Sequence, residues 1–204
     1  HEDGRHRFFH ELNANWPVSP KVSSSQLASY EDNILAHTKA LNDKRKANGL
    51  RPIVWKYYQW LSLLFAERYL DLFFHQPTSL LDGLNAFVDK FNQWRSGQGL
   101  TTSLEKFTVS ELNRVCFQNA TGSGKTLLMH ANVIQFRHYA DVSKRTNEFS
   151  RSVLITPNES LTDQHLREMQ LNGLSSQRFR ADLLGSPDLA RVDVIEIKIG
   201  RAHV

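Results

Sequence analysis

A short segment near the middle of the chain has the residue types and spacing of a phosphate-binding turn. It reads Asn119-Ala120-Thr121-Gly122-Ser123-Gly124-Lys125-Thr126. Glycines let backbone N–H groups approach an anion without a Cβ in the way, and a helix that follows adds oriented N–H groups. We therefore expect residues 120–126 to hold the phosphates of ATP. Lys125 would act at the β- and γ-phosphates as the catalytic residue, and the Thr126 hydroxyl would bind Mg²⁺.

The segment departs from the general pattern G-x-x-x-x-G-K-[ST] at its first position, which is Asn119. Asn tolerates a left-handed backbone better than most residues, so the turn is still feasible. The alternative is a glycine-rich turn with an unrelated lysine. The nucleotide loop requires a strand before it and a helix after it. A short apolar run at 114–118 and an apolar helical pattern at 127–139 meet that requirement.

Alternating elements around the loop predict an α/β fold with a parallel sheet. Residues 152–155 read as a buried strand, 159–171 as a helix and 192–197 as a further strand. Cys116, within the run at 114–118, is expected to be a small buried hydrophobe rather than a nucleophile.

The first hundred residues predict helices, after an irregular stretch up to about residue 24. Ser23 and its neighbours are suitable N-cap residues for a helix that starts at about Gln26. An aromatic-rich helix over 52–74 should be mostly buried, and a third helix should begin near Ser79 with Asp82 completing a capping box. The apolar face of the third helix comprises Leu80, Leu81, Leu84, Phe87, Val88 and Phe91.

Composition excludes several classes of protein. Hydrophobic residues make up 40% and charged residues 23%, which is an ordinary globular balance. The single cysteine rules out an internal disulfide framework and fits a reducing compartment. Charged residues break the most apolar stretch, so we expect a cytoplasmic protein without a membrane partner. The net charge of +4 favours polyanionic partners, nucleic acid included.

Two segments together resemble superfamily 2 helicases. The segment at 118–126 is similar to motif I, and its Ala-Thr-Gly-x-Gly-Lys-Thr form is closest to the helicase (Res) subunits of type I and type III restriction enzymes. Residues 153–165 are similar to motif Ia, an apolar strand followed by Thr-Pro and a helix. The resemblance implies a partial RecA-like domain, with Thr156, Pro157 and Asn158 against one nucleic-acid strand. A generic strand-to-helix turn is the alternative for this second segment.

The resemblance also implies groups outside these two segments. Gln59 could be the upstream glutamine that reads adenine, or else a polar residue on an exposed helical stripe. The family needs an Asp-Glu box, whose Asp binds Mg²⁺ and whose Glu polarises the attacking water. Asp193 and Glu196 are poor candidates, because charges interrupt their apolar run; we expect them to face solvent on an edge strand.

We expect three regions: helices over 1–100, a partial RecA-like ATP-binding domain over 101–198 and a non-native tail over 199–204. ATC GGA AGA GCA CAC GTC would encode that tail, and this string resembles the start of a widely used sequencing adapter. The full protein would then be an ATP-dependent helicase or translocase acting on double-stranded DNA. Methyltransferase and specificity subunits would be its partners. We expect the chain as given to bind nucleotide weakly or not at all and not to hydrolyse it.

Two other functions remain open from the sequence. One is a loop-containing ATPase or kinase that does not act on nucleic acid. The other is a non-catalytic module whose helices bind a partner. The histidines offer no zinc site at suitable spacing, since His6 and His10 lack a third ligand nearby.

Overall fold

The computed structural model describes residues 4–15, 22–120, 122–180 and 188–197 of the 204-residue chain. The predicted tail at 199–204 therefore lies outside the described residues. The helices are α1 (Arg7–Ala14), α2 (Ser24–Ala47), α3 (Tyr57–His75), α4 (Pro77–Gly97), α5 (Lys125–Val142) and α6 (Glu159–Leu171). The strands are β1 (Arg151–Thr156), β2 (Ser176–Arg178) and β3 (Asp188–Glu196), and two short 3₁₀ turns span Val109–Glu111 and Thr146–Glu148.

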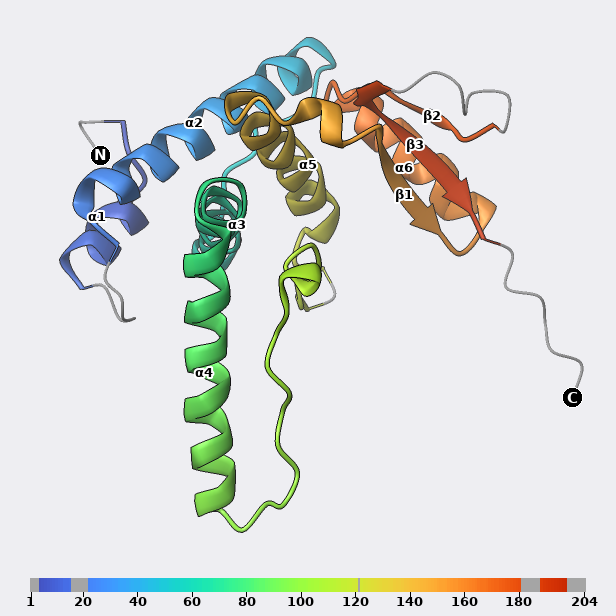
Figure 1. Ribbon diagram of the computed structural model, residues 1–204. Helices are drawn as coiled ribbons and strands as arrows, with labels where there is room; N and C mark the ends of the chain where they lie inside the picture. Colours follow the sequence, from blue (N-terminus) through green and yellow to red (C-terminus); the bar gives the residue numbers. More distant parts are fainter. Residues whose placement is uncertain (1–3, 16–21, 121, 181–187, 198–204) are drawn as a thin grey trace, which may run out of the picture.

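The three strands form one parallel sheet in the order β1-β3-β2, with α6 between β1 and β2 along the chain (Figure 1). Ile155 of β1 lies opposite Ile195 of β3. Helices precede the strands, so the predicted α/β class with a helical N-terminal region is confirmed. The short polar strand β2 was not predicted, because three residues carry no detectable alternation.

The predicted strand at 114–118 is wrong, because these residues are not in a strand and no described strand pairs with them. Val115 and Phe117 are 51% and 40% exposed, and Cys116 is exposed rather than buried. A strand persists only where a neighbour satisfies its backbone N–H and C=O groups. The prediction that β1 is buried is wrong on one face, where Val153 and Ile155 are 45% and 59% exposed.

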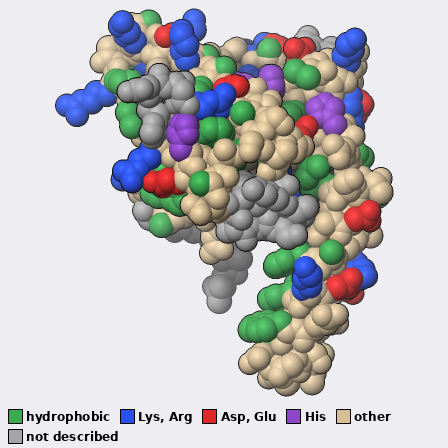
Figure 2. All heavy atoms as spheres, turned by 90° about the vertical axis from the view of Figure 1, so that its left-hand side faces the viewer, with side chains coloured by type: hydrophobic (Ala, Val, Ile, Leu, Met, Phe, Trp, Pro, Cys, Tyr) green, Lys and Arg blue, Asp and Glu red, His purple; other side chains and the backbone are tan. Residues whose placement is uncertain are grey.

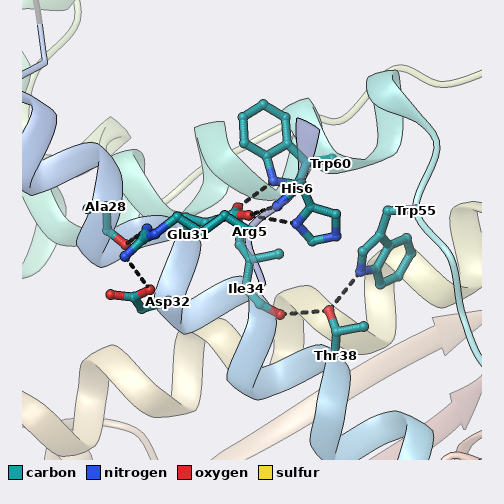
Figure 3. A network of polar contacts seen from close by, with 9 residues as sticks. All are labelled: Arg5, His6, Ala28, Glu31, Asp32, Ile34, Thr38, Trp55 and Trp60. Atoms are coloured by element: carbon teal, nitrogen blue, oxygen red, sulfur yellow. Dashed lines mark hydrogen bonds and ion pairs between the residues drawn. The ribbon is translucent and has the colours of Figure 1, made fainter. Parts of the chain in front are cut away.

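In the helical region, the predicted cap of α2 is confirmed and the start of α3 is displaced. Ser23 and Gln26 form a capping box. Residues 51–56 are not helical, although helix was predicted from Pro52. Hydrogen bonds to side chains of α2 hold this stretch. Trp55 Nε1 donates to Thr38 Oγ1 at 2.7 Å (Figure 3). Ile53 N donates to Asn42 Oδ1 at 2.6 Å.

Helix α1, which was not predicted, is anchored to α2 by a buried carboxylate. Glu31 is fully buried and accepts hydrogen bonds from His6 N at 2.8 Å and from Trp60 Nε1 at 2.7 Å (Figure 3). Burial alone would raise the pKa of Glu31, but its hydrogen bonds with His6 and Trp60 outweigh burial and lower it. Arg5 adds an ion pair to Asp32 at 2.9 Å.

One hydrophobic core joins the N-terminal helices to the sheet and its helices. Its buried members include Leu27, Ile34, Trp60, Leu128, Met169 and Val194. The core therefore crosses the domain boundary predicted near residue 100, and that boundary stays a prediction. None of the described helices is both long and apolar enough to span a bilayer. Helix α4 projects away from this body (Figure 1).

Candidate nucleotide-binding site

The glycine-rich loop leads directly into α5, and two of its glycines have a left-handed backbone. Gly122 and Gly124 have φ angles of 74° and 83°, a region that L side chains rarely adopt. Ser123 N donates to Ala120 O at 3.2 Å, which closes the turn. Gly124 is the N-cap of α5, so the first N–H groups of the helix have no partner within it. Thr121 lies outside the described residues.

Lys125 lies across the mouth of this loop. Its Nζ donates to Asn119 O at 3.2 Å and to Ala120 O at 2.9 Å, and the residue is exposed. These neutral acceptors are weaker partners for an ammonium group than phosphate oxygens are. Lys125 can therefore exchange the two carbonyls for an anion without leaving the loop.

Gln59 touches the loop from the start of α3. Its Nε2 donates to Ser123 O at 2.7 Å, and its Oε1 accepts from Lys56 N at 2.9 Å. The alternative that Gln59 sits on a solvent-facing stripe is wrong, because the side chain is half-buried against the loop. Tyr58, which sequence reasoning did not select, places its hydroxyl 3.4 Å from the same Ser123 oxygen. Its only sequence signal was its position next to Gln59.

A cavity of about 610 Å³ extends from the loop along α5. Its walls are Phe117, Asn119, Lys125, Thr126, Leu128, Met129, Asn132, Val133, Phe136, Ser152 and His165. Lys125 is the only lysine or arginine among these residues. Because most of the wall is apolar, only the loop end suits phosphate.

The residues expected to contact nucleic acid follow β1, and the structure separates them. Thr156 is 2% exposed, and its hydroxyl is 2.5 Å from Thr162 Oγ1. The Thr156 hydroxyl joins β1 to α6, and contact between this residue and nucleic acid stays a prediction. Pro157 and Asn158 are exposed. Asn158 also caps α6, because its Oδ1 accepts from Leu161 N at 2.9 Å.

Asp193 is not the solvent-facing edge residue that the sequence predicted. It is 1% exposed on the central strand β3. Arg151 Nη1 lies 2.5 Å from one of its oxygens, and Gln177 Nε2 donates to the other at 2.9 Å. Burial is possible because the arginine neutralises the carboxylate. Glu196, also on the central strand, is 21% exposed and 3.8 Å from Arg178 Nη1.

Sequence reasoning also missed a buried junction that positions α5 and α6. Asn172, at the end of α6, is 4% exposed. Its Nδ2 lies 3.0 Å from His130 Nδ1 on α5, and its Oδ1 accepts from Arg45 Nη1 on α2 at 2.9 Å. The partners are 42 and 127 residues away in sequence, so no local pattern indicates the junction. Among the described residues, no group of three or more His, Cys, Asp or Glu side chains could hold a metal ion.

Comparison with known families agrees with the loop, the helix and the parallel strands. A family model described as "Type III restriction enzyme, res subunit" matches residues 82–193, more than half of the chain. The chain belongs to this family. The matched region is therefore a RecA-like domain of a helicase-like ATPase family. Neither a search of curated proteins nor a search of solved structures found a match.

Proposed function

We propose that this res-family chain forms the ATP-binding part of a DNA helicase or translocase of the restriction type. The observation that carries the proposal is the loop itself. Two glycines with left-handed backbone precede α5, and the Lys125 ammonium lies 2.9 Å from Ala120 O at the loop mouth. A kinase, or an ATPase unrelated to nucleic acid, has no support from the family match.

The residues present fit ATP and Mg²⁺. Ser123 is buried, and among the described residues its Oγ has no hydrogen-bond partner. A Cβ at Gly124 would lie 2.7 Å from Gln59 Nε2, so any side chain there would displace the Gln59 amide, and the φ of 83° also favours glycine. Lys125 and the α5 N–H groups would hold phosphates, and Thr126 would hold Mg²⁺. Hydrolysis of bound ATP would supply the free energy for movement.

Gln59 can read a base and hold the loop at the same time. A glutamine amide has two N–H donors and two acceptor lone pairs on its oxygen. Lys56 N and Ser123 O use one of each. The remaining donor and lone pair match the N6 and N7 edge of adenine. Gln59 would thus link recognition of the base to the position of Ser123.

Pro157 and Asn158 would contact the backbone of one DNA strand. Both are exposed where β1 ends, and the N-terminus of α6 supplies N–H groups suited to phosphate. Methyltransferase and specificity subunits are the partners we propose for the assembled enzyme. We also propose that residues 1–100 form a helical region that packs against an ATP-binding domain beginning at about residue 101.

The test is whether nucleotide and DNA binding are coupled. We expect Mg²⁺ and a non-hydrolysable ATP analogue to change the affinity for a labelled duplex at least about fivefold, a typical coupling strength. Lys125→Ala should remove the change, and Asn158→Ala should weaken DNA binding with or without nucleotide. Asn113→Ala, an exposed control, should behave as wild type. Equal DNA affinity with and without the analogue would argue against the proposal.

A further inference from the structure

Helix α4 and the segment that follows it form a projecting arm, residues 77–108 (Figure 1). The amide of Asn92 both accepts from Leu104 N and donates to Leu104 O, each at 2.8 Å. Asn85 makes the same pair of bonds with Phe107, at 2.7 and 3.1 Å. Two side-chain amides thus hold the returning chain along α4, as a neighbouring strand would.

Three aromatic rings of the arm form a ladder, in which Phe91 is half-buried between the exposed rings of Phe87 and Trp94. The Phe87 and Phe91 rings are 6.1 Å apart at 14°, and the Phe91 and Trp94 rings are 5.6 Å apart at 30°. Phe87 is 65% exposed and Trp94 is 57% exposed. The sequence placed Phe87 on the apolar face of this helix, and the structure leaves most of its side chain exposed to solvent.

Charges are separated around the arm. At 100° per residue, Lys90 and Arg95 fall on either side of the ladder, whereas Asp82 and Asp89 fall on the far side of α4. Arg95 Cζ lies 5.8 Å from the centre of the Phe91 ring. Asp89 is paired with Lys106 at 2.9 Å. In the described part of the chain, no hydrogen bond or ion pair engages Lys90. Figure 2 shows hydrophobic side chains along one edge of the arm with a basic side chain beside them.

We propose that the ring ladder is a stacking site for single-stranded nucleic acid, with Lys90 and Arg95 against its phosphates. Exposed rings flanked by cations suit a strand whose bases have free faces, and base–aromatic stacking tolerates any sequence. A nucleic-acid strand brings a phosphate for every base and so supplies a partner for each cation, which an apolar protein surface does not. The inference rests on the proposed function in taking nucleic acid as the substrate, but the site is distinct from Pro157 and Asn158 and needs no ATP.

The experiment measures the fluorescence anisotropy of a labelled oligothymidylate with the 204-residue chain, without nucleotide, over a range of salt. Each ring lost should weaken binding at least about fivefold, so Phe87→Ala with Trp94→Ala should weaken it more than about tenfold. Trp94→Phe should retain binding, because a ring remains. Lys90→Gln should lower the slope of log affinity against log salt by about 0.7.

The controls separate this inference from the proposed function. Val54→Ala alters a side chain that is 83% exposed and lies outside the arm, and should leave binding unchanged. Lys46→Ala removes an exposed cation on α2, outside the arm, and should also leave it unchanged. The proposal of a stacking site is overturned if the wild type does not bind the oligothymidylate, or if the double ring variant binds it as tightly as the wild type does. Binding lost only in Asn158→Ala overturns the ladder and leaves the proposed function standing. Self-association that the double ring variant abolishes, with oligothymidylate binding unaffected, assigns the ladder to a second copy of the chain and overturns the proposal.

Discussion

Gly124 is the position in the loop where a substitution should have the clearest structural effect. Its backbone is left-handed, and any side chain would meet the Gln59 amide that binds Ser123 O. The sequence alone predicted a glycine-rich turn that leads into a helix, because that pattern is local. It did not predict that Gln59 would contact the loop, since that contact joins residues 64 apart.

Gly124→Ala should destabilise the fold by roughly 1–2 kcal/mol, because alanine pays the left-handed backbone penalty. Gly83→Ala is the matched control: nothing lies within 4 Å of its added Cβ, and it lies within helix α4. It should stabilise by roughly 0.5–1 kcal/mol. Urea unfolding of both variants measures the difference. Equal stability of the two variants would mean that the loop backbone is not as described.

The sequence predicted the ends of an element correctly where neighbouring residues determine them. It failed where contacts with residues far away in the sequence determine them. Helix α6 begins and ends as predicted, because Asn158 caps it and its apolar positions recur at helical spacing. The segment at 51–56 is extended because Thr38 and Asn42 bind it from α2. The run at 114–118 reads as a strand, yet pairs with none of the described strands. Hydrophobicity alone does not supply a partner.

The helix pair α5–α6 should weaken in acid through His130. This histidine is fully buried, and burial lowers its pKa from 6.5 to about 4. The unfolded chain binds a proton below about pH 6.5 and the folded chain does not, so His130 stabilises the fold above that pH. This contribution is lost between about pH 6.5 and pH 4 and amounts to about 3 kcal/mol at most.

Chemical unfolding of wild type and His130→Gln at pH 7.5 and pH 5 tests this titration. The wild type should lose more stability on acidification than the variant does. Glu67 is present in both proteins, so its contribution cancels in the comparison. Burial raises the pKa of Glu67, so Glu67 adds stability as the pH falls, which is opposite to the effect of His130. An identical loss in both proteins would show that His130 does not titrate as inferred.

Across the whole molecule, one hydrophobic core and one polar junction connect the helical region to the sheet, so we expect the two parts to unfold together. Asn172 joins α2, α5 and α6 through Arg45 and His130. These contacts explain why the predicted boundary near residue 100 does not coincide with a break in packing. Long-range packing of this kind leaves no periodic trace in sequence.

Asn172→Ala should destabilise the whole fold by roughly 1–3 kcal/mol, because it removes a hydrogen-bond partner from the buried His130 ring and from the half-buried Arg45 guanidinium. Unfolding followed by both Trp fluorescence and circular dichroism should shift together if the molecule unfolds as one unit. Asn113→Ala, at an exposed position, should shift neither signal. Two separate transitions would contradict a single cooperative unit.

The most direct test of the nucleotide site is calorimetric titration of the chain with Mg²⁺-ATP. We expect weak binding by wild type and by Lys46→Ala, an exposed lysine on α2, and at least about tenfold weaker binding by Lys125→Ala, which loses a charge-assisted phosphate contact. We expect no turnover, because Arg151 and Arg178 lie against Asp193 and Glu196. Equal affinity in Lys125→Ala and wild type, or steady hydrolysis that Lys125→Ala abolishes, would contradict this assignment.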